Sequence, residues 1–343
     1  MNTKPKVLLI YTGGTIGMIN DPLTGQLKSF DFNHLHRHVP EINRIHVELV
    51  TVSFDQPIDS SEMNPLRWQQ MAQLIFDNYD AYDGFVILHG SDTMAFSASA
   101  LSFMLQGLRK PVIFTGSQLP IGTIRTDGKE NLITSIEIAA DKDVDGQPMV
   151  QEVAVYFEYS LYRGNRSSKV SANQFEAFSS PNCAELARAG VTITYNRDAL
   201  FRTSLPHLVY QKEMGARVAL FKIYPGFSST SYVSLFDRSN TDVVILETFG
   251  SGNAPNDSHF HGLIENYLDD GGLVLNITQC NSGAVQQGKY ATSAFFEKVG
   301  VISGRDLTTE TALTKVMHLL GQNLSLTQMR SQLQTALCGE MTL

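Results

Sequence analysis

The sequence has few cysteines and no long apolar run, and both absences exclude classes of protein. Three cysteines occur in 343 residues, at Cys183, Cys280 and Cys338, and they lie far apart without a CxxC pair. They predict no disulfide framework, and a reducing cytoplasm is the expected location. No run approaches the ~18 apolar residues of a membrane span. The start, "MNTKPKVLLIYTGG", has too short an apolar stretch for a signal peptide.

Charge is also sparse. Charged residues make up 17% of the chain, the net charge is −8, and no run of lysine or arginine occurs. This mildly acidic composition lacks the basic patch with which proteins hold nucleic acid. We therefore expect no nucleic-acid partner and no membrane partner. The chain also has no repeat of 20–50 residues and no low-complexity tract.

Short apolar runs alternate with amphipathic stretches along the chain. The runs that predict strands in the first half are residues 6–14, 46–54, 84–92 and 110–118. The stretches that predict helices, by an apolar spacing of three to four residues, are 65–82 and 93–108. Because the strands are apolar throughout, they indicate an α/β fold with a mostly parallel sheet and helices on both faces.

The length and a hydrophobic content of 43% predict two domains. We expect a larger N-terminal α/β domain over residues 1–190, which holds most of the candidate catalytic residues below. A linker is expected over 191–215, where the sequence has no sustained period and mixes proline, glycine and charge. A second alternating block predicts a smaller C-terminal α/β domain over 216–343.

Several expected strands end in glycine followed by a small polar residue. The stretches are "TGGT", "HGSDT", "TGSQ", "GSGN" and "QCNSG". Parallel sheets bind ligands just beyond the carboxyl ends of their strands, so these polar groups gather where a ligand would lie. In the first stretch, Gly13 and Gly14 end an apolar run and are followed by Thr15. A tight turn explains the glycines, and the same turn would display the Thr15 hydroxyl at the edge of the sheet.

Common nucleotide and metal motifs do not fit. A dinucleotide fingerprint in "TGGTIG" would need glycine where Thr12 stands, and a phosphate loop in "GAVQQGKY" would need serine or threonine where Tyr290 stands. The "HLHRH" stretch, with His34, His36 and His38, has no carboxylate that completes a zinc pattern and predicts a polar helix face. No G-x-S-x-G elbow occurs, which argues against an ordinary serine hydrolase of that fold.

Two further stretches are informative. "HGSDTM", His89 to Met94, follows an expected strand and opens an expected helix. Ser91 or Asp92 would cap that helix, and the free N–H groups at its start would suit an oxyanion or a carboxylate. "RGNRSSK" ends in Lys169, which by itself would be interpreted as a surface lysine.

Taken together and in this order, "TGGTIG", "HGSDTM" and "RGNRSSK" resemble motifs of the bacterial L-asparaginases, closest to the cytoplasmic type I branch. Further stretches extend the resemblance over nearly the whole chain: "DSSEMNP", "KPVIFTGSQLP", "FGSGNAP", "NITQCNSG" and "GKYAT". The resemblance implies an amidohydrolase that splits L-asparagine into L-aspartate and ammonia without metal or organic cofactor. It also implies a homodimer, or a dimer of such dimers, with sites at a subunit contact.

The resemblance assigns catalytic roles by position. Thr15 matches the nucleophile, and Ser91, Asp92 and Lys169 match a second catalytic cluster in which a hydroxyl bridges towards the lysine. Backbone N–H groups near Thr15 and Ser91 would form an oxyanion hole, worth roughly 3–4 kcal/mol per donor. A lysine base must be neutral, whereas a neighbouring Asp92 carboxylate favours the charged form. We therefore interpret Lys169 as a group that relays and orients protons.

The resemblance also assigns substrate contacts. The segment "DSSEM", with Asp59, Ser60 and Ser61, matches the part that holds the substrate α-carboxylate. Asp92 matches the acid that holds the α-amino group. Asn253 in "GSGN" matches a polar residue that a partner subunit supplies near the site.

Three positions depart from the family pattern. Ser91 replaces the usual threonine, and its hydroxyl lacks the methyl group that restricts the rotamer, so we expect weaker preorganisation without loss of activity. The loop "INDPLTGQLKSF" lacks the usual catalytic tyrosine, with Gln26 or Leu27 in its approximate place, and Tyr11 is not an obvious substitute. Glu247 replaces an arginine that lies near "TQC" in enteric relatives.

Two consequences follow from these departures. The base that activates Thr15 is not identified by the sequence. A glutamate at position 247 would repel a substrate carboxylate, so we expect no regulatory asparagine site near Glu247 and Cys280. The alternatives are an amidohydrolase that prefers glutamine or an amidotransferase subunit, a non-catalytic amino-acid-binding protein on the same fold, and a nucleotide-binding protein.

Overall fold

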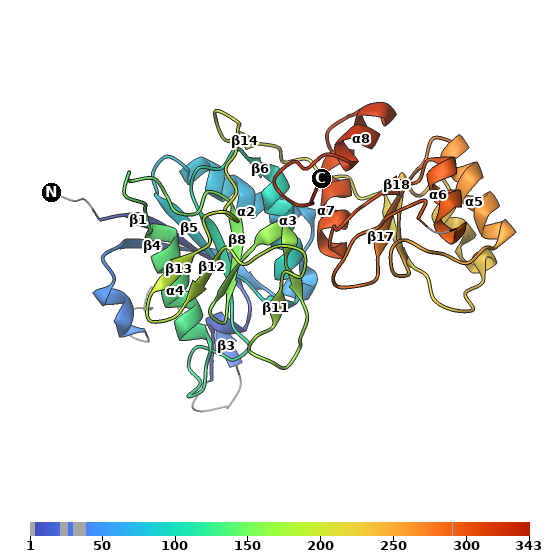
Figure 1. The fold of residues 1–343 in the computed structure, drawn as a ribbon. Coiled ribbons are helices and arrows are strands. Elements are labelled where there is room, and N and C mark those ends of the chain that lie inside the picture. Colours follow the sequence, from blue (N-terminus) through green and yellow to red (C-terminus); the bar gives the residue numbers. More distant parts are fainter. Residues whose placement is uncertain (1–3, 21–26, 30–38, 290) are drawn as a thin grey trace. The chain divides into compact units, whose positions relative to one another are not determined.

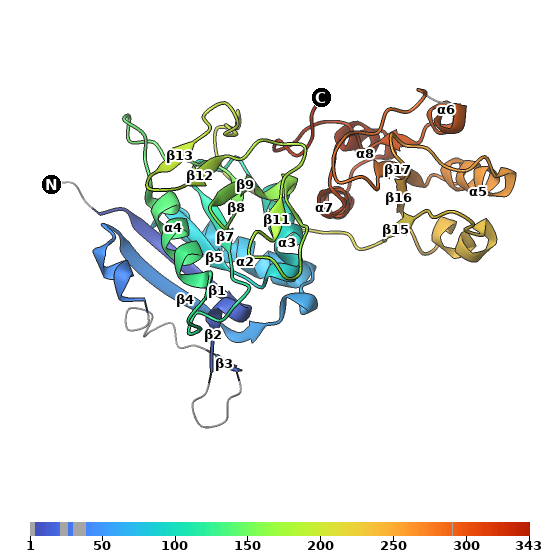
Figure 2. The ribbon, with the colours of Figure 1, turned by 60° about the horizontal axis from the view of Figure 1, so that its bottom comes forward.

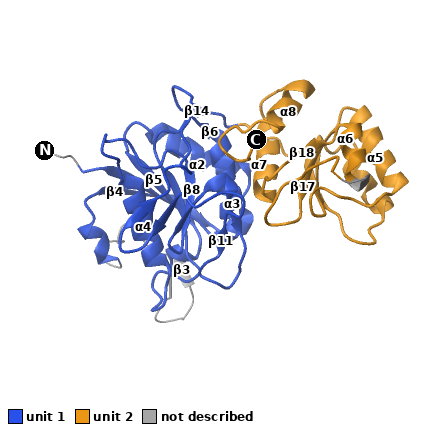
Figure 3. Cartoon of the chain, viewed as in Figure 1, with its two compact units in different colours: residues 1–212 blue, residues 213–343 orange. Residues whose placement is uncertain are grey.

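The computed structural model describes residues 4–20, 27–29, 39–289 and 291–343. The chain divides into two compact units, Met1–Lys212 and Glu213–Leu343, which are described separately (Figure 3). The prediction of an α/β protein with two sheet-containing parts is confirmed. Among the described residues, no helix is both long enough and apolar enough to cross a membrane.

Unit 1 is built on an eight-stranded sheet in the order β13-β12-β9-β8-β7-β5-β1-β4 (Figures 1 and 2). In chain order its strands are β1 (Lys6–Gly13), β4 (Glu48–Ile58), β5 (Gly84–Leu88), β7 (Val112–Thr115), β8 (Val153–Phe157), β9 (Ser160–Arg163), β12 (Ala187–Ala189) and β13 (Ile193–Tyr195). The strands from β4 to β8 pair in parallel, and β9, β12 and β13 continue the sheet in antiparallel pairing. The carboxyl ends of five parallel strands therefore meet at one edge.

Short strand pairs lie outside this sheet. They are β2 (Met18–Asn20) with β3 (Leu27–Ser29), β6 (Leu105–Gln106) with β14 (Val209–Tyr210), and β10 (Ser168–Lys169) with β11 (Phe178–Ser179). The expected linker, residues 191–215, thus carries two strands of unit 1, β13 and β14. These strands are three and two residues long. They are too short for an alternating pattern to be visible in the sequence.

Within the described part of unit 1, the sheet is covered by α2 (Pro65–Asn78), α3 (Met94–Met104) and α4 (Gly128–Ala140). The sequence explains where α2 begins, because Pro65 takes the first helical position and the Asn64 side chain accepts hydrogen bonds from two free N–H groups. The helix ends at Asn78, four residues before the expected limit. Tyr79, just after it, stacks on Phe85 of β5 with ring centroids 6.2 Å apart. This contact places α2 against one face of the sheet.

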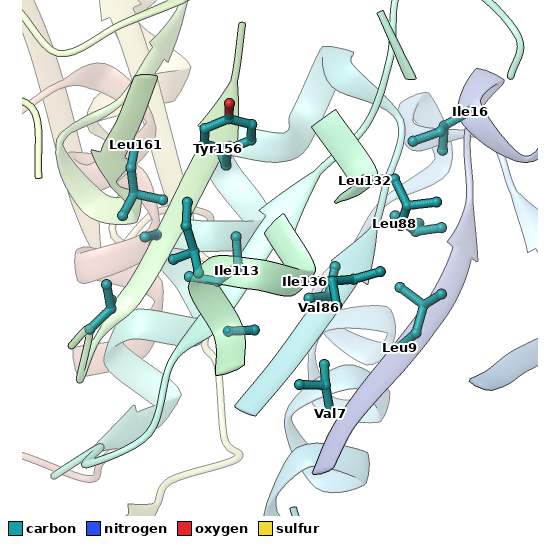
Figure 4. Packing of buried hydrophobic residues seen from close by; sticks show 14 of the residues in the cluster. Val7, Leu9, Ile16, Val86, Leu88, Ile113, Leu132, Ile136, Tyr156 and Leu161 are labelled. Atoms are coloured by element: carbon teal, nitrogen blue, oxygen red, sulfur yellow. The ribbon is translucent and has the colours of Figure 1, made fainter. Parts of the chain in front are cut away.

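The opposite face packs against α4. Val7, Leu9, Val86 and Ile113 alternate along their strands with other buried residues, and they contact Leu132 and Ile136 of α4 in one core cluster (Figure 4). The residues between them, such as Leu8 and Ile87, are also buried. Both faces of the sheet are therefore covered, as the unbroken apolar runs predict. Burial of each such aliphatic side chain contributes about 1.5–3 kcal/mol to the stability of the folded state.

Unit 2 has a four-stranded parallel sheet in the order β15-β16-β17-β18. Its elements are β15 (Val218–Lys222), β16 (Val243–Thr248), α5 (Ser258–Asp269), β17 (Leu273–Thr278), α6 (Ala291–Val299), β18 (Ile302–Ser303), α7 (Thr309–Leu320) and α8 (Leu326–Leu333). Alternate residues of β16 face two cores. Val243 and Ile245 pack with residues of α7 and α8, whereas Val244 and Leu246 pack with residues of α5 and with Phe296 of α6.

Unit 2 also contains a fully buried ion pair that the sequence pattern does not reveal. The Lys315 Nζ of α7 lies 2.7 Å from Glu340 Oε1, and neither side chain is exposed. The ammonium also donates to the carbonyl oxygen of Thr335, and Glu340 accepts from the backbone nitrogens of Leu337 and Cys338. The pair therefore fastens residues 335–340 to α7.

Breaking this pair is expected to destabilise unit 2. Lys315→Met leaves a buried carboxylate without its cation, which costs about 3–5 kcal/mol. The double variant Lys315→Met with Glu340→Gln is expected to recover part of that loss. Thermal and urea unfolding measure the change, with Lys298→Met, an exposed lysine of the same unit, as the matched control. Equal midpoints for the Lys315 and Lys298 variants would contradict the prediction.

Candidate active site

The turn that carries Thr15 is built from close backbone packing. Gly13 and Gly14 have φ of +143° and +88°, a region that side-chain-bearing residues rarely adopt. A Cβ on Gly13 would lie 2.1 Å from the carbonyl oxygen of Ile58, and one on Gly14 would lie 2.5 Å from the backbone nitrogen of Gly90. The expected sharp turn is confirmed. Half-buried Thr15 begins a 3-10 turn directly after it.

Lys169 joins two of the candidate catalytic residues. Its Nζ donates to Ser91 Oγ at 2.8 Å and to Asp92 Oδ1 at 2.7 Å. The Lys169 side chain is only 16% exposed, whereas Asp92 is 69% exposed. The carboxylate is thus available to a ligand while it holds the ammonium. β10 delivers Lys169 to this position from 77 residues further along the chain than Asp92.

The segment of Asp59 to Ser61 lies directly against the start of this cluster. Asp59 accepts from both the backbone nitrogen and the hydroxyl of Ser61, each at 2.9 Å, and these bonds lower the pKa of the Asp59 carboxyl. Ser60 is buried, and its carbonyl oxygen accepts from Thr93 Oγ1 at 2.6 Å. A Cβ on Gly90 would lie 2.5 Å from Ser60 Oγ.

These contacts bring the predicted residues of unit 1 to one edge of its sheet. Thr15, Asp59 to Ser61, and Ser91 with Asp92 follow the neighbouring strands β1, β4 and β5, and Lys169 reaches them from β10. Asn253 belongs to unit 2, in a tight loop after β16 where its backbone bonds to Phe249 in both directions. The structure of unit 2 by itself does not bring Asn253 to the other predicted residues.

Sequence reasoning missed Gln118. It follows β7 and accepts a long hydrogen bond of 3.5 Å from Ser91 Oγ, while its Nε2 donates to the carbonyl oxygen of Gln174 at 2.9 Å. Its backbone nitrogen donates to Asp127 at 2.8 Å. Gln118 thus links the Ser91 turn to the loop after Lys169. The stretch "TGSQ" shows the signal, because it ends a strand at the same edge of the sheet.

A group of acidic residues lies behind Gln118. Burial raises the pKa of Asp127, against the effect of its hydrogen bonds from Gln118 and Leu119. Burial also raises the pKa of Glu158 to about 7, and the charges of Asp127, Glu130 and Glu176 add to the rise. Glu158 lies in the turn between β8 and β9 with φ of +44°. Full ionisation of the carboxyl groups in this part of the sheet edge is therefore unfavourable.

Glu158 is expected to make the stability of unit 1 depend on pH. Burial raises the pKa of Glu158 from its ordinary value of 4.5 to about 7 in the folded state. The folded state therefore loses stability as pH rises from 4.5 to about 7, and the loss remains at higher pH. Glu158→Gln removes this charge, so the variant should gain thermal stability over the wild type at pH 8 but hardly differ at pH 5. Melting temperatures at both pH values measure this. Glu41→Gln, at an exposed glutamate of the same unit, is the control, and a pH-independent difference for Glu158→Gln would refute the assignment.

Some positions singled out in the sequence lie outside the described residues. They are Gln26 in the loop after Thr15, the three histidines of the expected polar helix face (His34, His36 and His38), and Tyr290. Tyr11 is buried in the core of unit 1, and its hydroxyl donates to the carbonyl oxygen of Gly17 at 3.3 Å. It therefore braces the turn that begins with Thr15. Among the described residues, no group of three or more histidine, cysteine, aspartate or glutamate side chains is arranged to hold a metal ion.

Comparison with known proteins agrees with this architecture. Residues 6–201 match the family model described as "Asparaginase, N-terminal", and residues 217–333 match "Glutaminase/Asparaginase C-terminal domain". Together the two matches cover most of the chain.

Full-length relatives support the same grouping. L-asparaginase 1 of Escherichia coli (strain K12) is 40% identical, over 99% of this chain and 98% of its own length. The 60 kDa lysophospholipase of Mus musculus is 38% identical over 100% of this chain, which spans 64% of that protein. The crystal structure of L-asparaginase I from Vibrio cholerae superposes with a TM-score of 0.90 at 38% identity, covering 99% of this chain and 100% of that one.

The fold and these matches define an amidohydrolase with two α/β units. The chain belongs to the asparaginase family.

Proposed function

We propose that the protein hydrolyses L-asparagine to L-aspartate and ammonia through an acyl-enzyme on Thr15. The observation that carries the proposal is the Lys169 ammonium, largely buried and bonded to both Ser91 and Asp92 beside the turn of Thr15. A protein that only bound an amino acid would not need a lysine held against a hydroxyl in this way. A hydrolase needs such a group to move protons.

Substrate recognition follows from the charges around this cluster. The exposed carboxylate of Asp92 would accept the α-ammonium group of the substrate. Ser60 and Ser61 would hold the α-carboxylate. The N–H and the hydroxyl of Ser61 both donate to Asp59 in the structure, so the hydroxyl would turn from Asp59 to the substrate. The side-chain amide would then lie between Thr15 and Ser91.

The reaction would proceed in two steps. The Thr15 oxygen attacks the amide carbon, its proton passes to the leaving nitrogen, and ammonia departs as the acyl-enzyme forms. Water then attacks the ester, and the Thr15 oxygen leaves with a proton as aspartate is released. Backbone N–H groups near Thr15 and Ser91 stabilise the negative oxygen in both steps, worth roughly 3–4 kcal/mol per donor. Ser91 and Lys169 relay and orient the protons.

The proposal includes the assembly and the location. We propose a homodimer, or a dimer of dimers, in which Asn253 of one copy completes the site of another. We also propose a cytoplasmic protein without metal or organic cofactor. The preference for asparagine over glutamine rests on the family resemblance and on the names of the relatives.

The first experiment measures ammonia release from L-asparagine and L-glutamine by the purified protein and by Thr15→Ala. Removal of the nucleophile is expected to lower kcat by roughly 10⁴- to 10⁶-fold. Thr335→Ala, at an exposed threonine of unit 2, is the matched control and should keep full activity. Faster release from glutamine would favour the glutaminase alternative. Thermal stabilisation by L-aspartate without ammonia release would favour the binding-protein alternative.

Glu247 generates a second expectation. It is buried at the end of β16, where it accepts from Thr309 Oγ1 and lies 3.6 Å from the Lys222 ammonium. The carboxylate of a second asparagine would meet the negative charge of Glu247, and the neighbouring Lys222 cation is already paired with Glu247. The rate should therefore rise hyperbolically with asparagine concentration. A sigmoidal curve that becomes hyperbolic in Glu247→Gln or Cys280→Ser would contradict this expectation.

A further inference from the structure

A buried chain of hydrogen bonds runs from the core of unit 1 to the Ser91 turn. The proposed reaction does not use these bonds. Trp68 Nε1 of α2 donates to Ser97 Oγ of α3 at 3.0 Å. Ser97 Oγ lies 2.9 Å from His89 Nε2, and His89 Nδ1 lies 2.7 Å from the carbonyl oxygen of Gly90. His89 and Ser97 are fully buried, and Trp68 nearly so.

The direction of every bond in this chain is determined. The Gly90 carbonyl can only accept, so His89 Nδ1 carries the proton and donates. Burial lowers the pKa of His89 to about 4, so the ring is neutral at pH 7 and its Nε2 is an acceptor. Ser97 must then donate its single proton to Nε2, and its oxygen accepts from Trp68. One tautomer and one hydroxyl rotamer satisfy all three bonds.

The end of the chain is a peptide group of the candidate site. The carbonyl oxygen of Gly90 and the N–H of Ser91 belong to the same planar trans peptide, so they point in opposite directions. A donor that holds the carbonyl on the core side therefore aims the Ser91 N–H away from the core. The same bond draws electron density toward the carbonyl oxygen and makes that N–H a stronger donor.

Gly90 is also the residue on which the other site segments pack. The turn before Thr15 contacts it through Gly14, and Ser60 lies against its α-carbon. A displacement of Gly90 would thus disturb the Thr15 turn and Ser60 together.

We propose that His89, fixed by Ser97 and Trp68, is a positioning residue that orients and polarises the Gly90–Ser91 peptide as a donor of the oxyanion hole. This inference rests on the proposed function, because an oxyanion forms only if the protein performs acyl transfer. His89 does not touch the substrate. It acts through the backbone of the neighbouring residue.

The test compares two serines of the same helix in the full chain. Ser97→Ala removes the donor to His89, whereas Ser102→Ala removes a buried hydroxyl that donates to Ala98 of its own helix at 2.8 Å. Ser97→Ala should lower kcat about 10- to 100-fold, less than the loss of a whole oxyanion donor, with KM changed less than about 3-fold. Ser102→Ala should leave both unchanged, although both variants lose some thermal stability.

Two further variants separate positioning from packing. Ser97→Thr keeps the hydroxyl and should restore most of the rate, and Trp68→Phe keeps an aromatic ring but should lower kcat in the direction of Ser97→Ala. Nuclear magnetic resonance of ¹⁵N-histidine should report the Nδ1–H tautomer for His89 in the wild type and in Ser97→Thr, and a tautomer mixture in Ser97→Ala.

The outcomes distinguish this inference from the proposed function. Equal kcat values for Ser97→Ala and Ser102→Ala, in an active wild type, would overturn the inference alone. A fall confined to KM would overturn it as well. A folded wild type that releases no ammonia from either amide would contradict the proposed function and the inference with it, even if His89 showed the Nδ1–H tautomer.

Discussion

Close backbone packing at glycine decides where the candidate catalytic residues of unit 1 lie. Gly13 rests on Ile58, Gly14 rests on Gly90, and Gly90 rests on Ser60, each at a distance that leaves no space for a Cβ. The three segments after β1, β4 and β5 are therefore brought together by the main chain itself. Side-chain packing alone would hold them several ångströms further apart. The Thr15 hydroxyl, the Ser60 segment and the Ser91 turn share one edge of the sheet because no side chain separates them.

The sparse charge of the chain is consistent with such a site. In the proposed function, much of the substrate recognition falls to backbone N–H groups and hydroxyls, which need no counter-ion. Lys169 and Asp92 are the exception, and they neutralise each other at 2.7 Å while Asp92 stays open to solvent. The acidic residues behind Gln118 make a different contribution. Burial and the neighbouring acidic charges raise the pKa of Glu158 to about 7, so the turn between β8 and β9 gains negative charge as pH rises through neutrality.

The fold followed from the sequence, and the site followed only in part. Unbroken apolar runs such as 84–88 predict buried parallel strands, and glycine pairs mark their ends. Lys169 by itself would be interpreted as a surface lysine, and it gained a role only through the order of three motifs. Gln118 and the Ser97–His89 contact depend on which strand and helix lie side by side, which no local pattern states. Lys315 and Glu340 could not be predicted as a buried pair, because each residue type is usually exposed.

If the proposed role of His89 holds, the chain of bonds from Trp68 to Gly90 connects stability with activity. α2 and α3 have apolar faces that bury against the sheet, and the same faces carry the indole N–H and the hydroxyl that hold His89. A polar group in that core is stable only if each donor and acceptor is satisfied, and here all are satisfied in one arrangement. The last acceptor is the peptide at the Ser91 turn, so the core has a single low-energy way to present that peptide. Precision at the site would then be a consequence of correct packing at Trp68, before this turn in the chain, and at Ser97, after it. Loops at a sheet edge are usually the most mobile parts of an α/β protein. This loop is held by its own core, which explains how a short turn of small residues can keep a donor aimed at one point.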